Sequence, residues 1–327
     1  MTYEKIVENF ELLFENKLDE ESAKNFLKEL YEKGEEAEEI AAGASVMRKH
    51  CLMLQLDKDM QDKLIDNCGT GGDKSGTFNI STTVSFVLAS LGSFVAKHGN
   101  RSITSRSGSA DMLESLGIDI NLSITKQKKM LEECGFVFLF AQNHHPAMKY
   151  VMPIRKSLDH RTIFNILGPL TNPAGVSKHM IGIFDKDFVP KVAKSLQLLG
   201  SRSAIVVSSK DGLDEASLSD ISYYSHLKDG ELEEGVIDPA LLKLECHDKD
   251  ALLGGDAQEN AQITYSILKG DEKGAKKDVV LLNAALALIA DLKANDLKEG
   301  LEMARYALES KKAYKKLNEI IDVSKKI

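Results

Sequence analysis

Three short segments of this 327-residue chain gather the residue types that bind a phosphate ester. Residues 69–73 read Gly-Thr-Gly-Gly-Asp, and glycines let an anion approach backbone N–H groups closely. Ser81 and Thr82 open an apolar helical stretch, whose first turn offers unpaired N–H groups and a favourable dipole. Residues 97–106 are basic, rich in hydroxyls and free of acids. Together these segments predict a site for a small phosphorylated molecule.

Each segment also has an ordinary structural interpretation. A glycine cluster is often only a tight turn, and basic residues in a loop are usually solvated charge. The glycine run is neither a dinucleotide-binding fingerprint nor a P-loop, because both need glycine where Lys74 stands. The context favours binding, since the chain has a formal net charge of −8 and a local excess of positive charge is not background.

An adjacent pair of carboxylates, Asp214 and Glu215, follows a predicted strand at 204–207. Carboxylate oxygens suit Mg²⁺, which usually keeps waters and substrate phosphates among its ligands. Such a pair on its own is most often solvated surface. Its interpretation as a metal site depends on the phosphate-binding segments elsewhere in the chain.

Two further groups could take part in chemistry. His144 and His145 are adjacent, but no third ligand is spaced nearby, so we interpret them as packing or substrate-lining residues rather than as a metal site. Arg155 could bind a carboxylate through two parallel hydrogen bonds or form a structural ion pair, and the residues alone favour neither. No nucleophile–base pair stands out, so we assign no catalytic acid or base.

The pattern of apolar residues predicts the elements that position these groups. Residues 1–60 show helical spacing almost throughout, and after residue 65 short β-rich runs alternate with helical stretches. Strands are expected at 94–96, 136–140, 180–184 and 204–207, and helices over 39–54, 82–91, 189–199, 279–289 and 297–308. This alternation predicts an α/β fold, with a mainly parallel sheet covered by helices and a small N-terminal all-helical domain. We place the helical domain at 1–65 and the large α/β domain, with the phosphate and metal sites, at 66–327.

Composition limits the class of protein. The chain has 43% hydrophobic and 28% charged residues, which is typical of globular proteins. No run of about 18 apolar residues occurs, so no transmembrane helix is expected, and the first residues carry no export signal. The four cysteines lie far apart, which indicates reduced thiols in a cytoplasm. The acidic net charge argues against nucleic acid as the main partner.

Taken in order, longer motifs of the chain resemble the anthranilate phosphoribosyltransferase family, which performs the second step of tryptophan biosynthesis. The resemblance covers roughly residues 20–320, and so many ordered motifs are highly specific. The matching motifs are Gly-Thr-Gly-Gly-Asp at 69–73, Thr-Phe-Asn-Ile-Ser-Thr at 77–82, Lys-His-Gly-Asn-Arg-Ser at 97–102, Ser-Gly-Ser-Ala-Asp at 107–111, Arg-Thr-Ile-Phe-Asn-Ile-Leu-Gly-Pro-Leu at 161–170, Gly-Leu-Asp-Glu at 212–215 and Asn-Ala-Ala-Leu-Ala-Leu at 283–288.

The resemblance implies a Mg²⁺-dependent transfer of the 5-phosphoribosyl group from phosphoribosyl pyrophosphate to the amine of anthranilate, with release of pyrophosphate. It also implies a helical domain hinged to a large α/β domain, as in pyrimidine nucleoside phosphorylases, with residues 150–172 returning to the helical part. The residues implied for phosphoribosyl pyrophosphate are Gly69, Gly72, Asp73, Thr77, Asn79, Ile80, Ser81, Thr82, Lys97, His98, Gly99, Asn100, Arg101, Ser102, Ile103, Thr104, Ser105 and Ser109. The residues implied for anthranilate are Gly69, Asn100 and Arg155, with His98 and His145 as neighbours. The resemblance also implies two Mg²⁺ ions per protomer, with the ligands Ser81, Asp214 and Glu215.

Two other functions are possible for a chain of this fold. A pyrimidine nucleoside phosphorylase of the same fold usually carries a third domain, for which this chain is too short. A non-catalytic relative that binds nucleic acid is disfavoured by the net charge of −8 and the intact Asp-Glu pair.

The resemblance also bears on the oligomeric state. Dimers of the family associate through the N-terminal helices, and here that region is about one helix shorter. Its apolar residues have little room to be buried, so we expect an exposed apolar patch and a homodimer through residues 1–60; they are Phe10, Leu13, Phe14, Phe26 and Tyr31.

Overall fold

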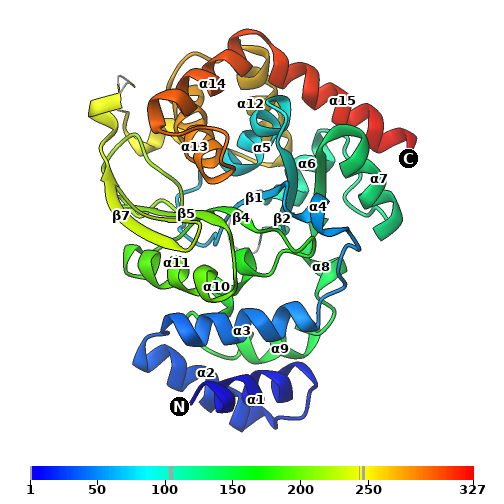
Figure 1. Ribbon diagram of the computed structural model, residues 1–327, viewed down its shortest axis with the longest axis vertical. Coiled ribbons are helices and arrows are strands. Elements are labelled where there is room, and N and C mark those ends of the chain that lie inside the picture. Colours follow the sequence, from blue (N-terminus) through cyan, green and yellow to red (C-terminus); the bar gives the residue numbers. More distant parts are fainter. Residues whose placement is uncertain (1, 103–105, 243, 245–246) are drawn as a thin grey trace.

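A computed structural model of the chain describes residues 2–102, 106–242, 244 and 247–327. Its centre is a seven-stranded sheet in the order β3-β2-β1-β4-β5-β6-β7, with helices on both faces (Figure 1). The strands are β1 Leu64–Gly69, β2 Phe94–Gly99, β3 Phe136–Phe140, β4 Lys178–Gly182, β5 Ser203–Ser209, β6 Ser222–Lys228 and β7 Glu231–Ile237. Strands β1 to β5 pair in parallel, whereas β6 and β7 are antiparallel. The prediction of a mainly parallel sheet is confirmed.

Helices surround this sheet and form a separate layer at the N-terminal end of the chain. Figure 1 places α1, α2, α3 and α9 below the sheet and α12 to α15 above it. The helices are α1 Tyr3–Phe14, α2 Glu20–Lys33, α3 Ala37–Lys49, α4 Lys58–Gln61, α5 Ile80–Ser90, α6 Ser109–Ser115, α7 Ile124–Cys134, α8 Ala141–His144, α9 Met148–Lys156, α10 Phe164–Leu167, α11 Val189–Leu198, α12 Ala257–Lys269, α13 Ala275–Ala290, α14 Leu297–Glu309 and α15 Lys312–Lys326.

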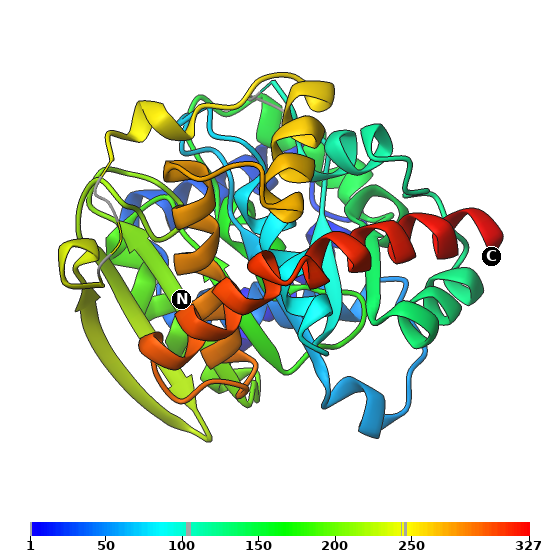
Figure 2. The same ribbon diagram turned by 90° about the horizontal axis from the view of Figure 1, so that it is seen from above.

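Both faces of the sheet are buried, which is why its strands read as continuous apolar runs. Because side chains alternate along a strand, Ile205 and Val207 of β5 pack into the core beneath α5 and α13. Ala204 and Val206 face the opposite core, which α11 and the N-terminal helices complete. In the view from above, α14 and α15 lie across α5, on the outer side of the first core (Figure 2).

The N-terminal helices bury most of the aromatic residues that the sequence placed on an exposed patch. Phe10, Phe14 and Phe26 are buried, and the Phe10 and Phe26 rings meet edge to face at 5.1 Å between centroids. Leu13 is buried as well, while Tyr31 is 46% exposed. The expected apolar patch is therefore wrong for four of its five residues. The reason is that residues of the return segment, those of α9 and α10, pack against α1, α2 and α3 and complete this core.

Two local expectations differ from the structure. The helix expected over residues 39–54 ends at Lys49, because the following backbone pairs with distant segments instead of with itself. Leu52 N donates to His144 O at 2.8 Å, and Leu54 N donates to Pro173 O at 2.8 Å. The sequence pattern also gives no indication of strands β1, β6 and β7.

In the part of the chain that the structure describes, no helix is long and apolar enough to cross a membrane. The division into domains at residue 65 stays a prediction.

Candidate functional site

The residues proposed for phosphate and metal binding meet at the carboxyl ends of the central strands. Gly69 ends β1, Gly99 ends β2 and Gly182 ends β4, and the Asp214–Glu215 turn follows β5. Gly69 and Gly182 are paired in register. Open α/β sheets bind ligands at this edge, because loops from neighbouring strands converge there.

The glycine turn after β1 is held over this edge by three other segments. Gly71 and Gly72 have φ of 67° and 76°, values that glycine adopts without the steric penalty of a side chain. The Gly71 N–H donates to Asp214 Oδ2 at 2.7 Å, and the Thr70 N–H donates to Gly182 O at 2.9 Å. Arg161 Nη2 donates to Gly72 O at 2.6 Å. The turn and the carboxylate pair, 143 residues apart, are therefore in direct contact.

Acidic groups crowd this contact. Burial, followed by the neighbouring Asp73 carboxylate, raises the pKa of Asp214 to about 7. Burial and Asp214 raise the pKa of Glu215 well above its ordinary value, although Lys97 acts in the opposite direction. Carboxylates brought together with so little countercharge are suited to a divalent cation.

The donor set matches Mg²⁺ bound partly by substrate rather than a cage built from protein alone. Among the described residues, no three or more His, Cys, Asp or Glu side chains converge as a metal-binding group. Mg²⁺ is commonly held by one or two carboxylates and completes its shell with water and phosphate oxygens. Asp214 and Glu215 fit that mode.

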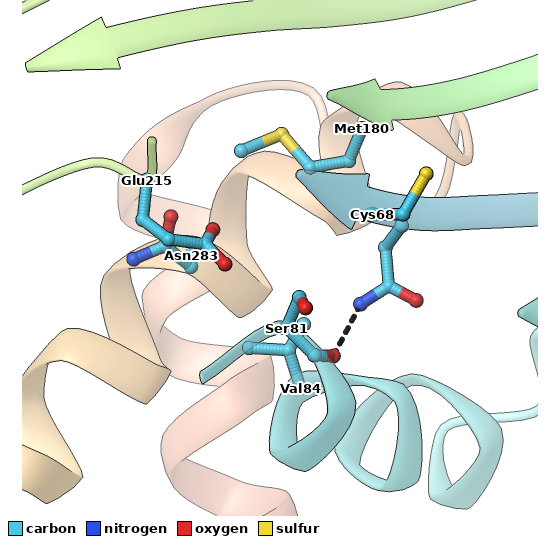
Figure 3. A pocket seen from close by; sticks show the side chains of 7 residues that line it. Cys68, Ser81, Val84, Met180, Glu215 and Asn283 are labelled. Atoms are coloured by element: carbon cyan, nitrogen blue, oxygen red, sulfur yellow. Dashed lines mark hydrogen bonds between the residues drawn. The ribbon is translucent and has the colours of Figure 1, made fainter. Parts of the chain in front are cut away.

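Figure 3 shows how Ser81 and Glu215 approach each other at the end of β1. Both line a cavity of about 10 Å³, which has room for one water-sized group and not for a substrate. Asn67 Nδ2 donates to Ser81 O at 2.7 Å, the dashed line in the figure. Asn283 reaches in from α13: its Oδ1 accepts from Ala216 N and its Nδ2 donates to Ala216 O, both at 2.9 Å. Asn283 thereby fixes the residue next to Glu215.

Lys97 lies inside the protein rather than in the phosphate loop. It is 1% exposed, and its Nζ donates to Asn67 O at 2.6 Å and to Ser81 Oγ at 3.3 Å. Burial lowers the pKa of Lys97, while the Cys68 thiol and the Asp66 carboxyl act in the opposite direction. In this structure the buried Lys97 ammonium therefore orients the hydroxyl of Ser81, the proposed metal ligand.

Arg101 is held by acids of the following helix. Its Nη1 donates to Glu114 Oε2 at 2.6 Å and to Asp111 Oδ1 at 2.7 Å, and its Nη2 donates to Glu114 Oε1 at 2.9 Å. These hydrogen bonds, those of Glu114 first, raise the pKa of Arg101. Ile103, Thr104 and Ser105, which the resemblance also places at the phosphate, lie outside the described residues.

The remaining polar residues predicted for the phosphate surround the start of α5. Asn79 precedes this helix without capping it, and its Oδ1 accepts from Asn260 Nδ2 at 3.0 Å. Thr82 Oγ1 is buried with no hydrogen-bond partner in the described part of the chain. Ser109 Oγ donates to Asn100 O at 3.2 Å, and an added Cβ at Gly99 would overlap Ser109 Oγ. Asn79 Nδ2 donates to Ser107 O at 3.4 Å, so the start of α5 lies against the loop. Of the other predicted members, Ile80 is the first residue of α5, Ser102 N donates to Asp111 Oδ2 at 3.3 Å, and Thr77 precedes the helix.

The residues predicted near anthranilate include two histidines and an arginine: His98 lies in β2, His145 follows α8 and Arg155 lies in α9. His98 and His145 are buried with ring centroids 5.1 Å apart, and His98 Nδ1 hydrogen-bonds Gly168 O at 3.1 Å. Burial lowers the pKa of His145 to about 4 and that of His98 well below its usual value, so both are neutral. Arg155 contacts Asn165 Oδ1 at 3.4 Å and lies over Phe164 at 5.7 Å. No carboxylate of the described residues forms an ion pair with Arg155.

Sequence reasoning missed several residues that support this site. Asp66 is buried in β1, where its Oδ1 accepts from the His98 N–H at 3.1 Å and its Oδ2 accepts from Asn172 Nδ2 at 2.7 Å. Asn283 and Arg161 stood inside motifs but received no role. The signal available was their type, since a polar residue inside an apolar run such as Asn-Ala-Ala-Leu-Ala-Leu implies a specific partner.

Comparison with known proteins gives concordant results. The family model described as glycosyl transferase family, a/b domain, matches residues 61–314. The chain is 44% identical over 322 residues to the anthranilate phosphoribosyltransferase of Petrotoga mobilis, covering 98% of this chain and 92% of that protein. The crystal structure of the enzyme of that name from Thermus thermophilus superposes with a TM-score of 0.93 at 38% identity, covering 99% and 96% of the two chains.

The Saccharomyces cerevisiae enzyme of that name offers two further structures. Its complex with PRPP and Mg has a TM-score of 0.87 and 28% identity, covering 99% of this chain and 93% of that chain. Its complex with 4-fluoroanthranilate has a TM-score of 0.86 and 27% identity, covering 99% and 92%.

Proposed function

The chain belongs to the anthranilate phosphoribosyltransferase family, and from this premise we propose that its site transfers the 5-phosphoribosyl group of phosphoribosyl pyrophosphate to the amine of anthranilate. The observation that carries the proposal is the contact between the glycine turn and the Asp214–Glu215 turn. It places the glycine turn and the carboxylate pair at one point, as a metal-bound diphosphate requires.

The diphosphate and its metal are proposed to lie between the glycine turn, the start of α5 and the carboxylate pair. We propose two Mg²⁺ ions per protomer, held by Asp214, Glu215 and Ser81 Oγ. When bound, the ions stabilise the negative charge that develops on the departing pyrophosphate. This proposal draws support from the raised pKa values of both carboxyls and from the yeast enzyme, which binds PRPP and Mg.

Anthranilate is proposed to be bound by Arg155, Asn100 and Gly69, with His98 and His145 as neighbours. Its carboxylate would meet the Arg155 guanidinium, which no acid of the described residues neutralises. The neutral histidines and Phe164 give the aromatic ring an apolar surround. The yeast enzyme binds 4-fluoroanthranilate, an aromatic acid of this kind.

The reaction needs positioning more than proton transfer. The bond between ribose C1 and the pyrophosphate oxygen breaks, a bond from C1 to the amine nitrogen forms, and the nitrogen then loses one proton. An aromatic amine is neutral at pH 7, so its lone pair is available without a strong base. Fixing both substrates in line therefore supplies much of the acceleration, and no residue is assigned as acid or base.

The test is the loss of anthranilate fluorescence on addition of phosphoribosyl pyrophosphate and Mg²⁺. Fluorescence should fall only when all three are present, with pyrophosphate released in equal amount. Phosphorolysis of a pyrimidine nucleoside without the transferase reaction would favour the phosphorylase alternative. Binding of nucleic acid without turnover of either substrate would favour the non-catalytic relative. The names of the matched relatives favour neither alternative.

We also propose that the protein forms a homodimer through its N-terminal helices and works in a reducing compartment such as the cytoplasm. Of the expected apolar residues only Tyr31 is exposed, and Tyr3 on α1 is 48% exposed. Light scattering tests the dimer, since a monomer would have the chain mass of 36.0 kDa. The compartment is proposed because Cys51, Cys68 and Cys134 are free thiols.

A further inference from the structure

Arg161 bridges the segment between α9 and α10 to the glycine turn. Its Nη2 donates to Gly72 O at 2.6 Å, and its guanidinium lies over the Phe184 ring at 3.7 Å from the centroid. Phe184 follows β4, and its N–H contacts Thr70 Oγ1 at 3.3 Å. Arg161 and Phe184, stacked on each other, therefore hold the turn at Gly72 and at Thr70.

The glycine turn needs such a hold. Gly71 and Gly72 are both exposed, and an added Cβ at Gly71 would meet nothing within 4 Å. Glycine loses more conformational freedom on ordering than any other residue, so an unsupported turn would lose this entropy when a diphosphate binds. Because Arg161 and Asp214 already fix the turn, this conformational entropy is lost during folding and does not oppose ligand binding.

The same segment leads to the proposed anthranilate contact. Asn165 Oδ1 accepts from Thr162 N at 3.0 Å and from Arg155 Nη2 at 3.4 Å. Thr162 is the next residue after Arg161, so a short chain of hydrogen bonds and one peptide bond joins the Arg155 guanidinium to the glycine turn. Just before Arg161, the His160 ring stacks on Tyr31 of α2 at 4.1 Å between centroids.

We propose that Arg161 is a positioning residue that fixes the glycine turn for the diphosphate. The inference rests on the proposed function. A planar guanidinium is required, because it donates to the Gly72 carbonyl while stacking flat on Phe184, and a lysine ammonium cannot do both.

The test compares Arg161→Lys with the wild-type protein in steady-state kinetics and in hydrogen exchange of residues 69–76. Arg161→Lys should raise the KM for phosphoribosyl pyrophosphate about tenfold, the effect of losing one hydrogen bond from a charged donor, with the KM for anthranilate changed less than about threefold. Exchange of the turn amides should be faster without any substrate. Arg202→Gln is the matched control, since Arg202 precedes β5, far from the carboxyl ends of the strands, and pairs with Asp229 at 3.5 Å.

A second variant keeps the inference testable if Arg161→Lys does not fold. Phe184→Leu leaves the arginine in place but removes the ring under it, and should shift both readouts in the same direction by a smaller factor. Unchanged turn exchange and unchanged KM in a folded variant would overturn the inference, as would an equal rise in both KM values, which indicates a general structural role. A wild-type protein without transferase activity would refute the proposed function instead, while the exchange measurement would still decide whether Arg161 holds the turn.

Discussion

Replacing Gly182 by alanine should disable the site without unfolding the sheet. Gly182 ends β4, in register with Gly69 on one side and Val207 on the other. A Cβ at Gly182 would overlap the backbone carbonyl oxygen of Asp214. This atom cannot rotate away as a side chain would, so the whole Asp214–Glu215 turn must move.

The size of the effect follows from the size of that movement. The added Cβ would lie more than 1 Å inside the 3.4 Å at which ordinary contact begins. A misplacement of about 1 Å in a catalytic arrangement can reduce the rate about hundredfold. Overpacking also costs about 1–3 kcal/mol of stability, which a domain with large cores on both faces of its sheet tolerates. We therefore expect kcat/KM to fall about hundredfold or more in a folded protein.

The assay is the loss of anthranilate fluorescence with phosphoribosyl pyrophosphate and Mg²⁺, with circular dichroism to confirm folding. Gly274→Ala is the control, because a Cβ there would meet only the tip of the Glu272 side chain, 3.3 Å away. The control should retain wild-type kcat/KM. A folded Gly182→Ala protein with kcat/KM within about threefold of wild type would refute the reasoning that this close approach seats the carboxylate turn.

Three further predictions concern charged groups. Asp214→Asn combined with Glu215→Gln should abolish most turnover and weaken Mn²⁺ binding measured by electron paramagnetic resonance while the fold is kept; near-normal activity at limiting Mg²⁺ would contradict the metal assignment. Arg155→Ala should raise the KM for anthranilate about tenfold or more, because a hydrogen bond to a charged group is worth ~1.5–3 kcal/mol, and should leave that for phosphoribosyl pyrophosphate nearly unchanged; an equal rise in both would make Arg155 structural. Burial raises the pKa of Asp66 from 3.8 to about 6, so the folded protein binds this proton more tightly than the unfolded chain. Titration of this carboxyl should therefore lower the free energy of unfolding as pH rises from about 4 to 6. The Asp66→Asn variant, unfolded with denaturant across this pH range, should lack this pH dependence. The same pH dependence in both proteins would exclude Asp66 as its source.

Much of the fold could be predicted from the sequence because its signals are local. The apolar runs at 136–140 and 204–207 lie within β3 and β5, and helical periodicity marks α11 and α14 closely. Strands β6 and β7 carry many polar and exposed residues at the edge of the sheet, so they lack such a run. The glycine and Asp-Glu segments could likewise be proposed as binding segments from their residue types, and the structure brings them into contact.

The tertiary structure alone decided which of these groups touch and which are turned away. Gly71 meets Asp214 because the sheet order places β1 beside β4 and β4 beside β5, a non-local arrangement that no sequence window contains. Lys97 and Arg101 look alike in the sequence, yet one is buried against Ser81 and the other is neutralised by Glu114. Residue type determines what a side chain can bind, whereas its partner is selected by packing and desolvation among segments far apart in the chain.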